Sequence, residues 1–368
     1  MKKNSSATTN YDKLQSQTIS FLRFFLIIGV VFIHTYIFLL ATNGKSLVLN
    51  SSNTPLFYYL AEFVSKVIGH ISVPAFFFIS GFLFFFKIDL TGIIFKRKLT
   101  SRIKTLLIPY LFWNSITLLF FYLAQSIPQM SELSLGRNKY ISDYCFIDYL
   151  HAYGIGQNHP ISFQFWFIRD LMIIILISPI IYYLIKKFKS LLIFFLGTLW
   201  YFKFWPNINF LDITALFFFS LGAYFSINKK NLILEFRKAF FVSVIFYPVF
   251  ALADLLTKGT NFCIYIHNIG LLMGITFFFN ITIFLLEKKY VKANTFLASA
   301  SFFIFAFHEP CQMFLIKIIF KTIHPSDDFT LTFIYFLTPI LIILFALFIY
   351  YYLGKFFPQF TKFITGGR

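Results

Sequence analysis

Ten long apolar segments constrain the fold of this 368-residue chain more than any other feature. An α-helix rises about 1.5 Å per residue, so about 20 apolar residues cross the ~30 Å hydrocarbon core of a bilayer. Only 12% of the residues are charged, whereas soluble domains carry about 25%. The sequence therefore predicts an all-α, polytopic membrane helix bundle. The expected transmembrane spans are residues 19–41, 60–86, 103–126, 164–185, 190–204, 210–227, 239–255, 264–286, 294–320 and 330–352.

These spans divide the chain into a membrane domain and two short tails. Residues 1–18 are predicted to be a cytoplasmic tail, residues 19–352 the membrane domain, and residues 353–368 a second cytoplasmic tail. The first apolar stretch has no small-residue cleavage site after it, which indicates a retained helix. The fifth span is short and ends before Pro206, so spans five and six could instead form a re-entrant pair.

The distribution of basic residues predicts the orientation of the bundle. With the N-terminus inside, the inner segments hold 22 of the 32 Lys and Arg residues and the outer loops hold 6. Such an excess on the cytoplasmic side is the positive-inside rule. The net charge of +18 therefore indicates topology and contact with anionic lipid headgroups, and argues against nucleic acid as a partner.

Two ionisable side chains, which are unfavourable in a membrane, lie within the first span. Arg23 and His34 are eleven residues apart, close to three helical turns, so both project from one face and differ in depth by about 16 Å. An ionisable side chain in this setting costs at least ~2.5 kcal/mol and usually faces the bundle interior or a water-filled path. The pair therefore indicates a reaction path through the membrane.

Two other helices place ionisable groups at a depth similar to that of His34. Arg169 and Asp170 lie near the outer end of the fourth span, and His308 and Glu309 lie in the outer half of the ninth. Pro310 follows them and cannot donate to the helical ladder, so a kink beside His308 is expected. Shared depth on three helices favours a common site.

Each of these groups also has a structural explanation. His34 could be a hydrogen-bonding contact between helices, and Arg169–Asp170 could be an interfacial ion pair. His308 could be a satisfied core histidine with Glu309 as its partner. His70, in the second span, is interpreted as structural.

A basic cluster precedes the third span on the inner side. It contains Arg97, Arg102 and Lys104, and either sets the topology or, together with Arg23, binds a phosphate-bearing cytoplasmic ligand. Earlier in the chain, Ser80 and Gly81 interrupt a Phe-rich run. On packing grounds these small residues allow a close helix–helix approach.

Taken together, these motifs resemble the acyltransferase 3 family of bacterial membrane acyltransferases that modify cell-surface carbohydrates. One departure is that Arg102 is followed by Lys104, where members often show a tighter arginine pair. The chain is also similar to the stand-alone type, without a fused extracytoplasmic domain. The motifs are Arg23-x10-His34, 73–82 (VPAFFFISGF), the basic run before 107–110 (LIPY), 165–171 (FWFIRDL) and 307–310 (FHEP).

The resemblance implies transfer of an acyl group, commonly acetyl, from cytoplasmic acyl-CoA to a hydroxyl of a cell-surface glycan or its lipid-linked precursor. It places the protein in the bacterial cytoplasmic membrane. In this interpretation His34 is a general base or, less favoured, an acyl carrier. The expected catalytic residues are His34, Arg169, His308 and Glu309. The expected donor-binding residues are Arg23, Ser80, Arg97, Arg102 and Lys104.

Other functional classes stay open at this stage. A polysaccharide exporter or flippase would also have many spans and a polar interior, and a non-catalytic domain could bind a wall precursor. Inverted-repeat transporters tend to show paired broken segments in two matching halves, which this sequence lacks. No metal is expected, because the three cysteines show no ligand spacing.

Overall fold

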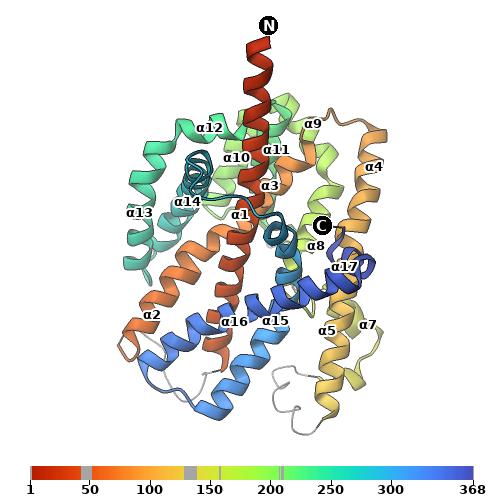
Figure 1. The fold of residues 1–368 in the computed structure, drawn as a ribbon, viewed down its shortest axis with the longest axis vertical. Helices are drawn as coiled ribbons and strands as arrows, with labels where there is room; N and C mark the ends of the chain where they lie inside the picture. Colours follow the sequence, from red (N-terminus) through yellow and green to blue (C-terminus); the bar gives the residue numbers. More distant parts are fainter. Residues whose placement is uncertain are drawn as a thin grey trace.

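The computed structural model describes residues 2–42, 52–127, 139–156, 159–206, 208 and 211–367, with backbone alone for 2–9 and 42. These residues form helices, and none of them forms a β-strand (Figure 1). The all-α prediction is therefore confirmed for this part of the chain. The α-helices are α1 Lys2–Thr42, α2 Pro55–Ala61, α3 Ser72–Phe85, α4 Gly92–Arg102, α5 Ile108–Ser126, α7 Phe146–Ala152, α8 Trp166–Leu176, α9 Ser178–Phe188, α10 Ser190–Tyr201, α11 Ile213–Ile227, α12 Leu232–Lys238, α13 Phe240–Leu256, α14 Cys263–Glu287, α15 Thr295–Ile323, α16 Asp328–Phe356 and α17 Pro358–Thr365. Shorter π- or 3₁₀-turns are η1 Glu62–Ile68, η2 Gly69–Ile71, η3 Ile103–Leu107, η4 Ile141–Asp143 and η5 Phe163–Phe165.

Six helices are long and apolar enough to cross a membrane, and eight if each of two bent helix pairs counts as one span. The bent pairs are α8–α9, with a 62° bend, and α12–α13, with a 65° bend. Pro179 opens α9, and because proline cannot continue the preceding helix, the chain turns there. The length criterion thus supports six to eight spans among the described helices, and the predicted ten are not reached.

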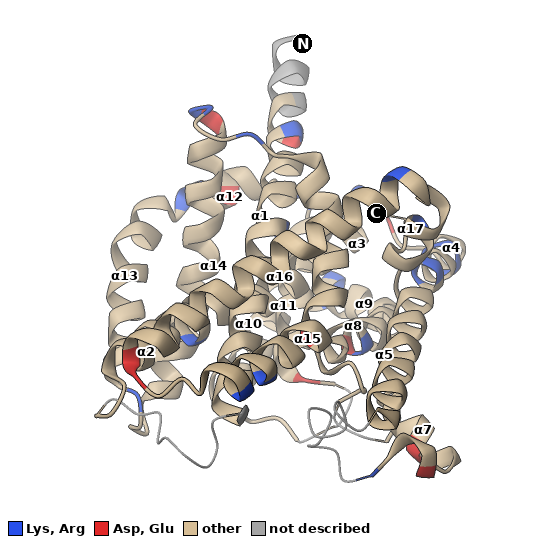
Figure 2. Cartoon of the chain, turned by 60° about the horizontal axis from the view of Figure 1, so that its bottom comes forward, with Lys and Arg blue, Asp and Glu red and all other residues tan. Residues whose placement is uncertain are grey.

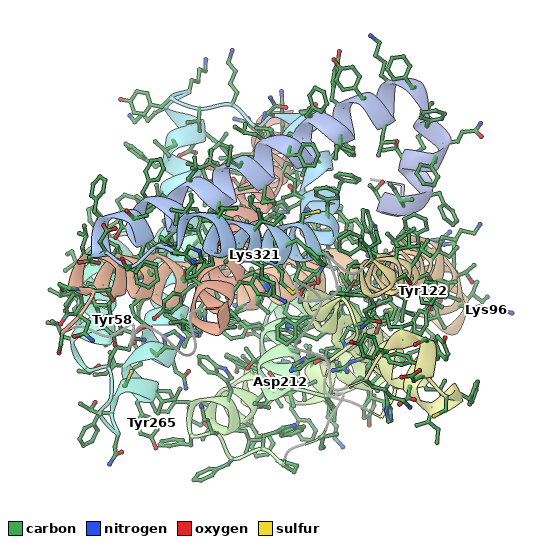
Figure 3. The ribbon with its side chains drawn as sticks, turned by 90° about the horizontal axis from the view of Figure 1, so that it is seen from below. Tyr58, Lys96, Tyr122, Asp212, Tyr265 and Lys321 are labelled. Atoms are coloured by element: carbon green, nitrogen blue, oxygen red, sulfur yellow. The ribbon has the colours of Figure 1, made fainter. Side chains whose placement is uncertain are left out.

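The difference comes from α10 and α11, where the fifth and sixth spans were expected. These helices have 12 and 15 residues, about 18 and 22 Å of rise, which is less than the hydrocarbon core. Figure 2 shows a bundle whose middle is mostly uncharged. Seen from the end opposite the N-terminus, Tyr58 and Tyr265 lie on one flank and Tyr122 on the other (Figure 3).

Helices α3 and α11 cross with almost no space between their backbones. A Cβ atom at Gly81 would overlap the carbonyl of Phe219, and one at Gly222 would overlap the carbonyl of Phe78. The close approach expected from Ser80 and Gly81 is therefore observed at Gly81. Small residues at membrane helix crossings permit such contact, which is stabilised by van der Waals packing. This crossing sets the position of α3, which forms one wall of the site described below.

Both predicted tails are helical where the structure describes them. Residues 2–18 belong to α1 without a break. At the other end, α17 folds back against α5, where the indole Nε1 of Trp113 donates to the carbonyl of Ile364 at 3.0 Å. Residues 358–365 are therefore packed against the bundle.

Replacing Gly81 or Gly222 with alanine is expected to destabilise the protein by about 1–3 kcal/mol, because backbone atoms must move to admit the methyl group. The measurement is thermal unfolding in detergent. Gly354→Ala is the control, since nothing lies within 4 Å of its Cβ position and alanine suits a helix. Equal melting temperatures for all three variants would contradict the crossing geometry.

Candidate functional site

A cavity of about 200 Å³ opens between α1, α3, the end of α4, η3, η5, α8 and α15. Apolar side chains form most of its wall, including Val30, Phe76, Ile79 and Phe305. Few polar residues reach it, as is typical of ligand pockets. The polar lining residues are Arg23, His34, Ser80, Arg102, Gln164 and Ser301.

One face of α1 runs along this cavity. Arg23, Ile27, Val30 and His34 all line it, at the spacing that places side chains on one helical stripe. Eleven residues of helix separate Arg23 from His34 by about 16 Å along the axis. The predicted shared face is confirmed, and the cavity has a guanidinium toward one end and an imidazole toward the other.

The guanidinium end contains two arginines from different helices. Arg23 comes from α1 and Arg102 from the end of α4, and neither forms an ion pair with any residue that the structure describes. The Arg102 guanidinium lies 5.9 Å from the ring centre of Phe84, a cation–π distance. Lys98 donates from Nζ to the carbonyl of Phe84 at the end of α3. Positive charge is thus concentrated at this end without a matching carboxylate among the described residues.

The predicted donor-binding residues fall into two groups. Arg23, Ser80 and Arg102 line the cavity. Arg97 and Lys104 are exposed and lie outside its lining. In the basic run, Arg102 and the half-buried Lys98 are the residues that turn inward. The other two predicted residues could meet a ligand only outside the cavity.

At the other end, His34 is 6% exposed and surrounded by rings. Its ring centre lies 5.0 Å from that of His308 and 5.8 Å from that of Phe163. No hydrogen bond to the His34 ring occurs within the described residues. A buried imidazole in this state retains both nitrogens for a ligand.

His308 is fully buried, and its hydrogen bonds define its ring. Nδ1 lies 2.7 Å from the carbonyl of Phe305 and 3.1 Å from that of Ile304. Since carbonyls only accept, Nδ1 carries the proton. Nε2 has no hydrogen-bond partner among the described atoms. His308 therefore offers a buried acceptor beside the His34 ring.

Pro310 leaves an unpaired carbonyl in α15, and a side chain from another element pairs with it. Proline lacks the N–H that would bond to residue 306. Instead, Gln164 donates from Nε2 to the Ala306 carbonyl at 3.0 Å. Gln164 also lines the cavity. The hydrogen bond from Gln164 to Ala306 thus holds η5 against α15, close to the site. Helix α15 itself continues past Pro310 to Ile323.

A second buried amide ties α15 to α1. Gln312 donates from Nε2 to the Val31 carbonyl at 3.1 Å and to the hydroxyl of Thr35. These contacts lie within about one turn of His34 and His308, so they hold the two histidine-bearing helices in register. Glu309 is 6% exposed on the same helix and is outside the cavity lining.

Arg169 is buried beside the cavity but does not line it. Its Nε and Nη2 lie 3.0 and 2.9 Å from the Asp170 carboxylate, and Nη1 donates to the Gly154 carbonyl at 3.3 Å. Nearby, Tyr110 donates to the Tyr153 carbonyl at 2.7 Å. Arg169 thus contacts the segment between α7 and α8 at Gly154. The two residues form an ion pair, as one explanation from the sequence suggested, but the pair is buried in the bundle and Arg169 does not reach outward.

Sequence reasoning missed two polar residues that line the cavity, Gln164 and Ser301. Gln164 directly precedes the FWFIRDL motif, and the demand for a donor created by Pro310 could have indicated it. Ser301 is seven residues before His308, two helical turns and thus the same face. Lys98 belongs to the basic run, but the sequence does not reveal which lysine turns inward.

Comparison with known proteins identifies the family of this chain. A family model described as an acyltransferase domain matches residues 17–362. This chain belongs to the acyltransferase 3 family. The succinoglycan biosynthesis protein ExoH of Rhizobium meliloti (strain 1021) is 28% identical over 225 residues, which is 59% of this chain and 55% of that protein. The chain therefore matches about half the length of this curated relative. No solved structure matches.

The acyltransferase domain thus includes all of the helices that line the cavity. Within the described residues, no group of three or more His, Cys, Asp and Glu side chains could hold a metal ion. The side chains that reach the cavity can bind anions at one end and accept or donate protons at the other.

Asp170→Asn is expected to lower stability by several kcal/mol, on the order of 3, because it leaves the buried Arg169 cation without its carboxylate. Thermal unfolding and protease cleavage within residues 139–156 are the measurements. Asp89→Asn is the control, since its pair with Lys186 has side chains 52% and 75% exposed and such pairs contribute at most about 1 kcal/mol. An equal loss in both variants would exclude a clamping role for Arg169.

Proposed function

We propose that the chain is a membrane O-acyltransferase that moves an acyl group, commonly acetyl, from cytoplasmic acyl-CoA to a hydroxyl of a cell-surface glycan or its lipid-linked precursor. The observation that carries the proposal is the single cavity bounded by Arg23 and Arg102 at one end and His34 at the other. Family membership supports the reaction class.

The arginine end suits the donor. Coenzyme A carries several phosphate charges, and guanidinium groups without carboxylate partners bind phosphate through charge-assisted, bidentate hydrogen bonds. A cavity of about 200 Å³ is smaller than the ~300–1,000 Å³ of pockets that enclose whole ligands. It fits a narrow thioester arm, and the nucleotide then stays at the arginine end.

The histidine end suits the transfer step. A neutral imidazole can take the proton of an attacking hydroxyl. The hydroxyl oxygen bonds to the thioester carbonyl carbon, the carbon–sulfur bond breaks, and His34 passes the proton to the departing thiolate. Ser80, which lines the same cavity, is a donor available to the carbonyl oxygen. In this proposal His34 is a general base, and the acyl-carrier role stays the alternative.

Neighbouring residues have supporting roles in this proposal. His308 is a positioning residue, because its Nε2 can accept the N–H of His34 and direct the other nitrogen into the cavity. Arg169, paired with Asp170, holds Gly154 in the segment between α7 and α8. In this proposal the acceptor enters beside that segment. Glu309 follows His308 and does not line the cavity. In this proposal it stabilises α15 next to His308 and does not contact the substrate.

The proposal includes ten membrane segments, of which α10 and α11 are the short ones, with both termini in the cytoplasm of a bacterium. The 22 inner and 6 outer basic residues support this orientation. Arg23 then lies toward the cytoplasm, where the donor is made, and His34 toward the outside, where the glycan is.

His34→Ala is expected to reduce acyl transfer about 10²- to 10⁴-fold, the usual contribution of a general base. The measurement is ester content of the surface glycan in cells that carry the variant. His324→Ala, at an exposed histidine, is the control. If esters persist in the His34 variant while export of the polymer stops, the chain is an exporter and the enzyme proposal fails.

Arg23→Ala and Arg102→Ala are each expected to weaken acyl-CoA binding about 10- to 100-fold, because each removes charge-assisted hydrogen bonds to phosphate. Titration of the purified protein with acetyl-CoA measures this. Arg97→Ala provides the comparison, since that exposed residue does not line the cavity. If Arg97→Ala weakens binding as much as the other two, the donor is bound at the surface instead.

A further inference from the structure

A second cavity lies near the N-terminal part of α1, at the end of the bundle predicted to be cytoplasmic. Its volume is about 420 Å³, and it shares no lining residue with the acyl cavity. It opens between α1, the end of α3 and the turn that joins α11 to α12 (Figure 1). Its charged residues are Asp12, Lys87, Asp89, Lys229 and Lys230.

The charges in this cavity do not cancel locally. Asp12 pairs with Lys87 at 2.6 Å, and Asp89 pairs at 3.5 Å with Lys186 from α9. Each acid therefore has its own lysine. Lys229 and Lys230 form no ion pair within the part of the chain that the structure describes. Two positive charges thus remain at the cavity wall, available to an anion.

The cavity wall also contains a residue with a buried hydroxyl. Ser226 lines it and is 7% exposed, yet its Oγ has no hydrogen-bond partner among the described atoms. The side-chain oxygens of the two neighbouring amides already accept hydrogen bonds, Gln15 from the Leu232 N–H at 2.9 Å and Asn231 from the Ile233 N–H at 3.0 Å. A buried hydroxyl without a partner is costly, and a ligand acceptor would satisfy it.

The turn holds both lysines in defined positions. The Lys230 N–H donates to the Phe225 carbonyl at 2.9 Å, and its ammonium lies 5.0 Å from the ring centre of Tyr224. Lys229 has φ of 55°, the left-handed conformation that favours glycine at the end of a helix. Because glycine adopts this conformation without strain, Lys229 can be replaced by glycine with the backbone unchanged.

We propose that this cavity binds a phosphate group, with Lys229 and Lys230 as its cations and the Ser226 hydroxyl as a donor. Lysine ammonium groups and hydroxyls are common phosphate ligands. The Phe82 and Phe86 rings, 5.2 Å apart, line the same cavity and can contact an apolar part of the ligand. The phosphate belongs either to an anionic phospholipid headgroup or to a soluble phosphorylated compound.

The test uses the whole protein in phosphatidylcholine nanodiscs. One arm adds inorganic phosphate, and the other adds phosphatidylglycerol to the lipid. The readout is the melting temperature, since a ligand that binds the folded state stabilises it. The test variant is Lys229→Gly with Lys230→Gln. Glycine suits the backbone at 229, so the variant is expected to fold.

The chain provides a matched control in the turn after α14. Lys288 and Lys289 are also adjacent and exposed, and Lys289 has φ of 59°, but neither lines this cavity. Lys289→Gly with Lys288→Gln therefore makes the same chemical change outside the proposed site. Both double variants lose two positive charges and gain one glycine. An effect of these changes that does not depend on the cavity is therefore expected to be equal in the two.

We expect the added ligand to raise the melting temperature of the wild type and of the control variant. The test variant should lose this increase, because its affinity for the ligand is reduced about 10-fold or more. A shift with phosphatidylglycerol alone assigns the site to a lipid headgroup, and a shift with inorganic phosphate assigns it to a soluble ligand. Ser226→Ala should weaken the same response. No shift in the wild type, or equal shifts in both double variants, would overturn the proposal.

Discussion

Burying polar groups inside an apolar bundle is the constraint on which this structure depends. Where hydrocarbon or packed rings surround a polar atom, water is absent and the protein itself must supply the partner. Gln312 of α15 bonds to α1, Gln164 bonds to the Ala306 carbonyl that Pro310 leaves unpaired, and Asp170 pairs with Arg169. These bonds fix the helices around the cavity more specifically than apolar contacts can, because hydrogen bonds are directional.

The exceptions to this rule indicate function. Arg23 and Arg102 line one cavity without an acidic partner in the described chain, and His34 lines it without a hydrogen bond. At the other cavity, Lys229, Lys230 and the Ser226 hydroxyl are in the same condition. A ligand could supply the partner that each of these groups lacks. The unpaired groups therefore indicate which kind of ligand each cavity binds.

Helical spacing and membrane cost were enough to predict part of the site. Arg23 and His34 were expected on one face and line one cavity, and His308 was expected near His34 and lies beside it. The basic run was less informative. Its composition indicates phosphate or topology, but whether Arg97 or Arg102 turns inward depends on how α4 is rotated against α3 and α5, which neighbouring side chains decide.

The sequence by itself determined the all-helical class, the family and the polar face of α1, because helix periodicity and the cost of burying charge act locally along the chain. Only the tertiary structure decided that Arg169 contacts the segment before α8 at Gly154, and that Gln164 compensates Pro310. Those outcomes depend on which helix lies against which, and residues far apart in the sequence meet only when the bundle is packed.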